Sequence, residues 1–425
     1  LYENIFGCLI ANNFVKVVAY ADDLNILVRN NHEFDTVLQL VSYFSIYSKI
    51  KLNFAKSQYL RFNGCLSGPH QIKEVESLNV LGVLICQNFN KLVEINYDSY
   101  LNKLKYTLSL HQKRILNLFQ KAWLLNTYVL SKIWYICQIF PPNNKHLAAI
   151  KSICGQFIWQ GFIFKVPRNE LYLPVIKGGL ALTDVESKAK SLFIKNILYS
   201  NADGNAPLDN FMLGQINNST LTRNMREWIV KADELKLESH LNSSKKIYDF
   251  FIHSLNIKCK TMEDMPNLMW SNLLNNLDSN FLNSKCKTVL FCIFKDIVLN
   301  KKKLHLYGIR GTDSKFCENC GLVESVSHLV KYCQTSEEIW RWLKNILNKR
   351  LKILVKDPDE LLSLSIGDRD FKYKAALWLT VQTIVYNLEK RGFGDLNEFK
   401  QGIRIVRFNN KAIFERHFKH FLNIF

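Results

Sequence analysis

The sequence lacks long apolar runs, internal repeats and long low-complexity tracts. No hydrophobic stretch approaches the roughly 18–20 residues that a bilayer-spanning helix needs, so we expect no membrane partner. The chain opens Leu1-Tyr2-Glu3 without a basic segment, and no secretory signal is visible there. With 425 residues, of which 48% are hydrophobic, the composition predicts ordinary packed cores in about two to four domains.

Acidic residues are scarce relative to basic ones. The chain has 56 Lys and Arg against 37 Asp and Glu, which gives a formal net charge of +19 at pH 7. Such a balance attracts polyanions, most often nucleic acid, and a basic protein without an anionic partner is the alternative. The 11 cysteines are odd in number and scattered, which favours a reducing intracellular location, the nucleus or the cytoplasm, over a disulfide framework.

Changes in composition divide the chain into four regions. Residues 1–95 are rich in short apolar runs that predict strands, and residues 96–200 have the periodicity of helices. Residues 201–305 begin with a polar, Asn-rich linker, and residues 306–425 contain a Cys/His cluster followed by helices. We therefore expect an α+β protein. The predicted strands are Phe14–Ala19, Leu24–Val28, Gln58–Phe62 and Leu78–Ile85, and the predicted helices include Glu33–Ser48, Tyr97–His111, Arg114–Phe140, Ile150–Trp159 and Asp184–Tyr199.

Two adjacent carboxylates, Asp22 and Asp23, lie between the first two of these strands. Neighbouring carboxylates repel each other when both are ionised, so such a pair usually needs a cation or solvent. Carboxylate oxygens suit Mg²⁺, which binds through one or two carboxylates together with substrate phosphates. The alternative is a solvated Asp-Asp turn in an ordinary hairpin.

The segment Tyr20-Ala21-Asp22-Asp23 resembles the signature hairpin of reverse transcriptases. The stretch Ile50–Ser57, which contains Lys56, resembles the segment that follows in that family, although Ile50 stands where Leu is more common. Leu81-Gly82-Val83 resembles the primer-grip hairpin, whose glycine allows close approach of a backbone. Later segments resemble the thumb of LINE-type (non-LTR) retrotransposon polymerases, namely Arg114–Leu116, Leu130–Tyr135, Phe157–Gly161 and Leu173–Leu180.

The resemblance implies RNA-directed DNA synthesis, with an RNA template and a DNA primer or target as partners. It implies that Asp22 and Asp23 hold Mg²⁺, that Lys56 assists proton transfer, and that Tyr20 and Gly82 contact nucleic acid. It also implies a partial right-hand polymerase palm with β-hairpins over 1–95, an α-helical thumb over 96–200, a connector over 201–305, and a small zinc knuckle plus a helical domain over 306–425.

The family uses a third aspartate upstream of the hairpin, but residues 1–21 contain no Asp. We therefore expect the chain to be a fragment of such a polymerase that is inactive alone. One alternative is a non-catalytic nucleic-acid-binding remnant that uses the thumb and the knuckle. Another is a structural or assembly remnant. Lys56 also has a plain alternative role as a surface lysine at the start of a strand.

The Cys/His cluster has the spacing of a tetrahedral zinc site. Cys317, Cys320, His328 and Cys333 are separated by two, seven and four residues. Three thiolates and one imidazole favour Zn²⁺ over hard cations, and such knuckles often contact RNA or single strands. The alternative is three buried free cysteines and a core histidine. A similar Cys-Cys-His-Cys element lies C-terminal to the polymerase in LINE-type proteins.

Basic and aromatic residues alternate in the expected thumb, where Lys113, Arg114 and Lys121 are the candidate phosphate contacts. For any single lysine a solvated helix face is the alternative. A further basic cluster near the C-terminus includes Arg404, Arg407, Lys411 and Arg416. We expect Trp340, Trp342 and Trp378 to be core residues rather than stacking platforms.

Overall fold

The computed structural model describes the greater part of the chain, and it is a mixed α+β protein in which 64% of the described residues are helical and the sheets are small. The coarse α+β expectation is therefore confirmed. The described residues are 5–10, 13–21, 23–49, 51–62, 72–160, 166–202, 226–231, 243–259, 267–308, 314–364, 366 and 370–418. No helix among them is long and apolar enough to cross a membrane.

The chain forms two compact units, each built from segments that are separate in sequence. Unit 1 comprises Leu1–Leu110, Thr127–Cys154 and Asp184–Asn256. Unit 2 comprises His111–Asn126, Gly155–Thr183 and Ile257–Phe425. Residues of the expected thumb, 96–200, are thus shared between both units.

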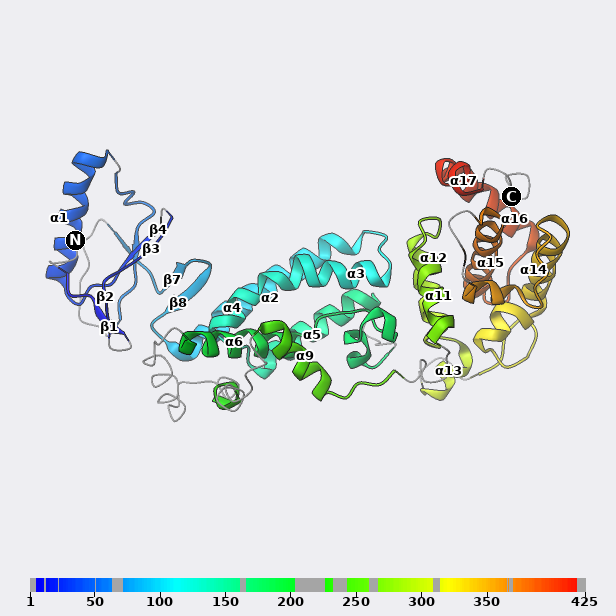
Figure 1. Ribbon diagram of the computed structural model, residues 1–425, viewed down its shortest axis with the longest axis horizontal. Helices are drawn as coiled ribbons and strands as arrows, with labels where there is room; N and C mark the ends of the chain where they lie inside the picture. Colours follow the sequence, from blue (N-terminus) through cyan, green and yellow to red (C-terminus); the bar gives the residue numbers. More distant parts are fainter. Residues whose placement is uncertain are drawn as a thin grey trace. The chain divides into compact units, whose positions relative to one another are not determined.

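In its described residues, the first part of unit 1 forms four separate two-stranded sheets (Figure 1). Three of them are antiparallel hairpins and one is a short parallel pair. The hairpins are β1 (Cys8–Ile10) with β2 (Asn13–Val15), β3 (Val17–Tyr20) with β4 (Asp23–Ile26), and β7 (Ser77–Val80) with β8 (Val83–Cys86). The parallel pair is β5 (Gln58–Tyr59) with β6 (Lys73–Glu74).

Helix α1 (Asn31–Ser48) follows the β3–β4 hairpin and has clear signals at both ends. Asn30 caps it, because its Oδ1 accepts a hydrogen bond of 2.9 Å from the backbone N–H of Glu33. The helix ends at Lys49, which adopts the left-handed conformation with φ 62°. The buried carboxylate of Glu33 accepts a 3.0 Å hydrogen bond from the backbone N–H of Arg29, which fixes the chain that enters the helix.

The helical part of unit 1 contains α2 (Phe89–Gln112), α4 (Trp134–Ile139), α6 (Val185–Ala202) and α9 (Ser244–Ser254), together with the first part of α5 (Asn144–Trp159). Two buried tyrosines of α2 anchor it to the chain on either side of α4. The Tyr97 hydroxyl donates to the carbonyl of Phe140, just after α4, at 2.6 Å, and the Tyr100 hydroxyl donates to the carbonyl of Val129, before α4, at 3.2 Å. These contacts hold α2 alongside α4 and the residues that flank it.

The single helix that the sequence predicts over Arg114–Phe140 is divided in the structure. It consists of α3 (Leu118–Leu124), the π-helical turn η1 (Leu125–Val129), the 3₁₀ turn η2 (Leu130–Lys132) and α4. Asn117 sets the later start, because its side chain accepts from the N–H of Gln120 while the Gln120 side chain accepts from the N–H of Asn117. This prediction was wrong in its extent but correct in its helical character.

Unit 2 is organised around helix α15 (Phe371–Lys390), whose side chains are buried along most of its length. Trp378 is buried against Phe414, with ring centroids 5.0 Å apart at an angle of 82°. Trp340 is also buried and Trp342 packs on the same core, which confirms the expected core role of these tryptophans. The other helices and helical turns between residues 267 and 418 are α11 (Asn267–Asp278), α12 (Ser284–Phe294), α13 (Lys301–Leu306), η5 (His328–Tyr332), α14 (Gln334–Asn345), η6 (Ile346–Arg350), η7 (Pro358–Ser363), α16 (Leu396–Asn409) and α17 (Lys411–Phe418).

Candidate metal centre and basic pocket

Four ligand atoms of unit 2 converge on one point. The ligand atoms of Cys317, Cys320, His328 and Cys333 all lie within 4.8 Å of one another. The Sγ atoms of Cys317 and Cys333 are 3.9 Å apart, and the Cys320 Sγ is 3.3 Å from the His328 Nε2. Zinc bonds of about 2.0–2.3 Å in a tetrahedron place ligand atoms about 3.3–3.8 Å apart. The predicted convergence is confirmed, and the cluster could hold a metal such as zinc.

A tight turn presents the first two cysteines. The N–H of Cys317 donates to the carbonyl of Leu322 at 2.7 Å, and the N–H of Gly321 donates back to the carbonyl of Cys317 at 2.9 Å. Gly321 has φ +72°, a conformation that glycine adopts without steric cost. His328 begins η5 and Cys333 follows its last residue, with a 2.8 Å hydrogen bond from the Cys333 N–H to the His328 carbonyl. The local sequence therefore brings all four ligands together within a short segment.

The pKa shifts of His328 and Cys333 favour the forms that bind a metal, whereas the shift of Cys317 opposes it. Burial lowers the pKa of His328, which favours the neutral imidazole that a metal requires. Burial alone raises the pKa of the Cys333 thiol, but hydrogen bonds from Asn319, Cys317 and Thr335 outweigh it and lower that pKa below its ordinary value. At Cys317 burial dominates and raises the pKa. The donor set of three sulfurs and one imidazole nitrogen fits zinc rather than a hard cation.

Gly392 lies directly against this cluster, and sequence reasoning missed it. A Cβ atom at Gly392 would lie 2.9 Å from the Cys333 Sγ and 3.2 Å from the Cys317 Sγ. Gly392 also has φ +88°, and its carbonyl accepts a 2.9 Å hydrogen bond from the Thr335 hydroxyl. Nothing in the ligand spacing points to this glycine, which comes from the connection between α15 and α16.

The acidic hairpin forms as predicted, with Tyr20 opposite Asp23 in the last pair of its register. Ala21 occupies the turn with φ 51°, and Asp22 lies outside the described residues. Tyr20 is 68% exposed, and Asp23 is exposed beside it. Within the described part of the chain, no group of three potential metal ligands includes Asp23. Magnesium binding by Asp22 and Asp23 therefore stays a prediction, as does the role of the exposed Lys56.

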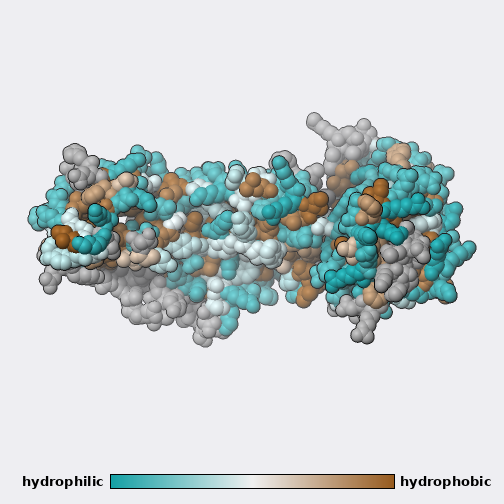
Figure 2. Space-filling model, turned by 90° about the horizontal axis from the view of Figure 1, so that it is seen from above, coloured by the Kyte–Doolittle hydropathy of each residue, from teal (hydrophilic) through white to brown (hydrophobic). Residues whose placement is uncertain are grey.

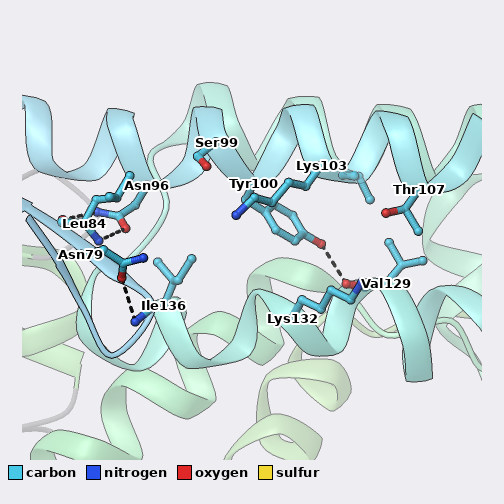
Figure 3. Close-up of a pocket in the computed structure, with 12 residues that line it drawn as sticks. Asn79, Leu84, Asn96, Ser99, Tyr100, Lys103, Thr107, Val129, Lys132 and Ile136 are labelled. Carbon is cyan, nitrogen blue, oxygen red and sulfur yellow. Dashed lines mark hydrogen bonds between the residues drawn. The ribbon is translucent and has the colours of Figure 1, made fainter. Parts of the chain in front are cut away.

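A pocket of about 260 Å³ in unit 1 lies beside the tip of the β7–β8 hairpin (Figure 3). Lys103 of α2 and Lys132 of η2 line the pocket from two different elements, and the Lys132 ammonium also lies 4.4 Å from the centre of the Tyr128 ring. No acidic residue is present in the lining, which consists of Asn79, Gly82, Leu84, Asn96, Ser99, Tyr100, Lys103, Leu104, Thr107, Val129, Lys132 and Ile136. Two ammonium groups without a carboxylate in the lining make this pocket suitable for an anion.

A single buried side chain attaches the hairpin to α2. The Asn96 Oδ1 accepts from the backbone N–H of Leu84 at 2.9 Å, and the Asn96 Nδ2 donates to the carbonyls of Leu84 and Leu92 at 2.8 Å. Asn79 holds the tip, because its Oδ1 accepts a 2.9 Å hydrogen bond from the N–H of Gly82. Gly82 is exposed with φ +87°, so the tip remains open to a ligand.

The three basic candidates of the expected thumb lie in different environments. Lys113 and Arg114 are exposed at the end of α2 and in the following turn. Lys121 is buried, and its ammonium donates to the carbonyl of Ile158 at 3.1 Å beside the ring of Phe157. The assignment of Lys121 as a nucleic-acid contact is therefore corrected, because its charge is directed into unit 2 rather than toward a ligand.

Comparison of the chain with protein-family models and with curated proteins finds no match.

Proposed function

We propose that the chain is a nucleic-acid-binding part of a LINE-type reverse transcriptase, with the polymerase hairpin, the primer-grip hairpin, thumb helices and a zinc knuckle. The observation that carries the proposal is the pocket beside Gly82. It combines an open glycine tip with Lys103 and Lys132, and its lining has no acid. A phosphate of a template–primer duplex supplies the anion that such a pocket favours.

The acidic hairpin supports the polymerase part of the proposal. Asp23 is exposed opposite Tyr20 at the tip of an antiparallel hairpin, where its carboxylate is accessible to a metal ion that also binds substrate phosphates. The candidate zinc centre in unit 2 supports nucleic-acid binding, since knuckles with this ligand set often contact RNA or single strands. The net charge of +19 favours the same class of partner.

The pocket is tested by fluorescence anisotropy with a labelled RNA–DNA hybrid duplex. The variant Lys103→Glu/Lys132→Glu is compared with Lys91→Glu/Lys145→Glu, which makes the same charge change at exposed residues of unit 1 outside the pocket. We expect the pocket variant to reduce the slope of log affinity against log salt by about two, roughly one for each lost phosphate contact. Equal effects of the two variants would rule out the pocket as a specific contact.

Polymerase activity needs its own test, because non-catalytic nucleic-acid binding is the second candidate function. Residues 1–21 contain no aspartate that could complete the carboxylate set of the family. We therefore expect no primer extension by residues 1–425 on an RNA template with Mg²⁺. Extension that Asp22→Ala abolishes would show that these residues suffice for catalysis. Hybrid-duplex binding without extension agrees with the proposal.

A further inference from the structure

Helix α16 carries an outward face that its own core does not use. Phe408 is 84% exposed and Ile405 is 60% exposed, whereas Phe399 and Ile403 of the same helix are buried in the core of unit 2. Arg404 is also exposed, one residue before Ile405 and one turn before Phe408. We call Arg404, Ile405 and Phe408 the α16 strip.

The charge around the α16 strip is positive. Residues 396–418 contain five Lys and Arg and two acidic residues, Glu398 and Glu415. Both acids are engaged elsewhere: Glu398 accepts from the Tyr386 hydroxyl at 2.8 Å and pairs with Lys390, and Glu415 is 3.8 Å from Lys411. No acidic side chain interrupts the strip itself, which favours a polyanion over an acidic or neutral protein surface.

The size of the apolar area argues in the same direction. Protein-docking surfaces are usually contiguous apolar patches. On the face that Figure 2 shows, the coloured surface of the C-terminal helices is mostly hydrophilic, with small apolar patches between polar side chains. An isolated aromatic ring beside an arginine is instead the arrangement that stacks on a base while a phosphate is neutralised.

We propose that the α16 strip binds an unpaired nucleic-acid strand, with a base stacked on Phe408 and a phosphate held by Arg404. The strand must be single because base faces are covered in a duplex, and only an unpaired base offers its π-face to an exposed ring. The inference deepens the proposed nucleic-acid function and rests on it. It differs in its ligand, since the pocket beside Gly82 is assigned to a duplex.

The test measures binding of a labelled oligothymidine to the full chain at low salt. Phe408→Ala is expected to weaken binding about tenfold, because one stacked base is lost. Phe408→Trp keeps a larger ring and is expected to retain the affinity, whereas Phe408→Leu keeps apolar area without a ring and is expected to lose it. The control is Phe44→Ala on α1, a phenylalanine that is 55% exposed and has no basic residue within one helical turn.

Four outcomes decide between the strip and its alternatives. Loss in Phe408→Ala and Phe408→Leu, with hybrid-duplex binding unchanged, supports the strip. Unchanged oligothymidine binding in Phe408→Ala overturns it. If Phe408→Ala weakens oligothymidine binding but Phe408→Leu binds as tightly as the unaltered chain, apolar contact is sufficient and the stacking role is overturned. Sedimentation gives the oligomeric state. If the unaltered chain self-associates and Phe408→Ala is a monomer that still binds oligothymidine, the face belongs to a contact with a second copy and the proposal is overturned. The pocket and the strip are tested with different ligands. If Lys103→Glu/Lys132→Glu does not change hybrid-duplex binding, the proposed pocket fails while the result for the strip, measured with oligothymidine, still stands.

Discussion

A side chain at Gly392 would occupy space that two ligand sulfurs need. We expect Gly392→Val to reduce zinc affinity by at least tenfold, because its Cβ would come within 2.9 Å of the Cys333 Sγ. The control is Gly308→Val, where φ is also positive, at +62°, but no atom lies within 4 Å of the added Cβ. Competition with a chromogenic chelator measures both variants. Similar losses in the two would attribute the effect to backbone strain rather than to contact with the cluster.

Cys320 is one of the four candidate ligands and is the least buried of the three cysteines among them. We expect Cys320→Ser to bind markedly less zinc per chain than the unaltered protein, because a serine hydroxyl is a poor substitute for a thiolate. Cys86→Ser is the matched control, a half-buried cysteine of unit 1 outside the cluster. Elemental analysis after dialysis gives the zinc content. Full zinc content in Cys320→Ser would mean that the remaining three groups bind without it.

At the scale of elements, Asn96 attaches the β7–β8 hairpin to α2. We expect Asn96→Ala to lower the free energy of unfolding of unit 1 by about 1–3 kcal/mol, because the backbone groups of Leu84 lose their partners. The change should also weaken hybrid-duplex binding, since the hairpin tip borders the pocket. Asn102→Ala, at an exposed position of the same helix, is the control. Urea unfolding followed by circular dichroism gives the comparison, and equal midpoints would contradict the attachment.

The ion pairs of Glu186 make the stability of unit 1 depend on pH. Burial alone raises the pKa of this carboxyl, but hydrogen bonds and charges from Lys151 and Lys190 outweigh it and lower the pKa. A lowered carboxyl pKa stabilises the fold above the ordinary value near 4.5, and this contribution is lost as pH falls through the folded pKa. We expect Glu186→Gln to be less stable than the unaltered chain at pH 7, with a difference that shrinks as pH falls below the ordinary value of 4.5. Melting curves whose difference stays constant from pH 7 into this acidic range would contradict this.

Local sequence patterns predicted the secondary-structure elements better than they predicted the long-range contacts of individual residues. The hairpin around Tyr20 and Asp23 and the turn that presents Cys317 and Cys320 depend on neighbours in sequence, so alternation and spacing were enough to find them. The burial of Lys121 depends on the carbonyl of Ile158, and the position of Gly392 depends on the loop after α15. Such contacts join distant segments, and no local pattern carries them.

For the whole molecule, charge is the property that composition alone predicts. The excess of 56 basic over 37 acidic residues gives +19, but it does not say which face meets a ligand. Two basic places on the folded chain are candidates, the pocket lined by Lys103 and Lys132 and the α16 strip with its exposed ring. Because they differ in shape and side chains, we assign them different ligands, a duplex to the pocket and a single strand to the strip.

Removal of zinc should affect the knuckle far more than the helices around α15. The metal would join residues 317–333 to one another, whereas α15 is buried among α12, α14 and α17 by a large apolar core. A structural zinc site contributes folding free energy directly, but a core of this size does not depend on it. We therefore expect a chelator to lower the melting temperature of the chain while most of the far-ultraviolet helical signal remains at 25 °C. Cys320→Ser should melt at the chelated temperature and show no response to chelator. Loss of most of the helical signal on chelation would mean that the metal, rather than the apolar core, determines the fold of unit 2.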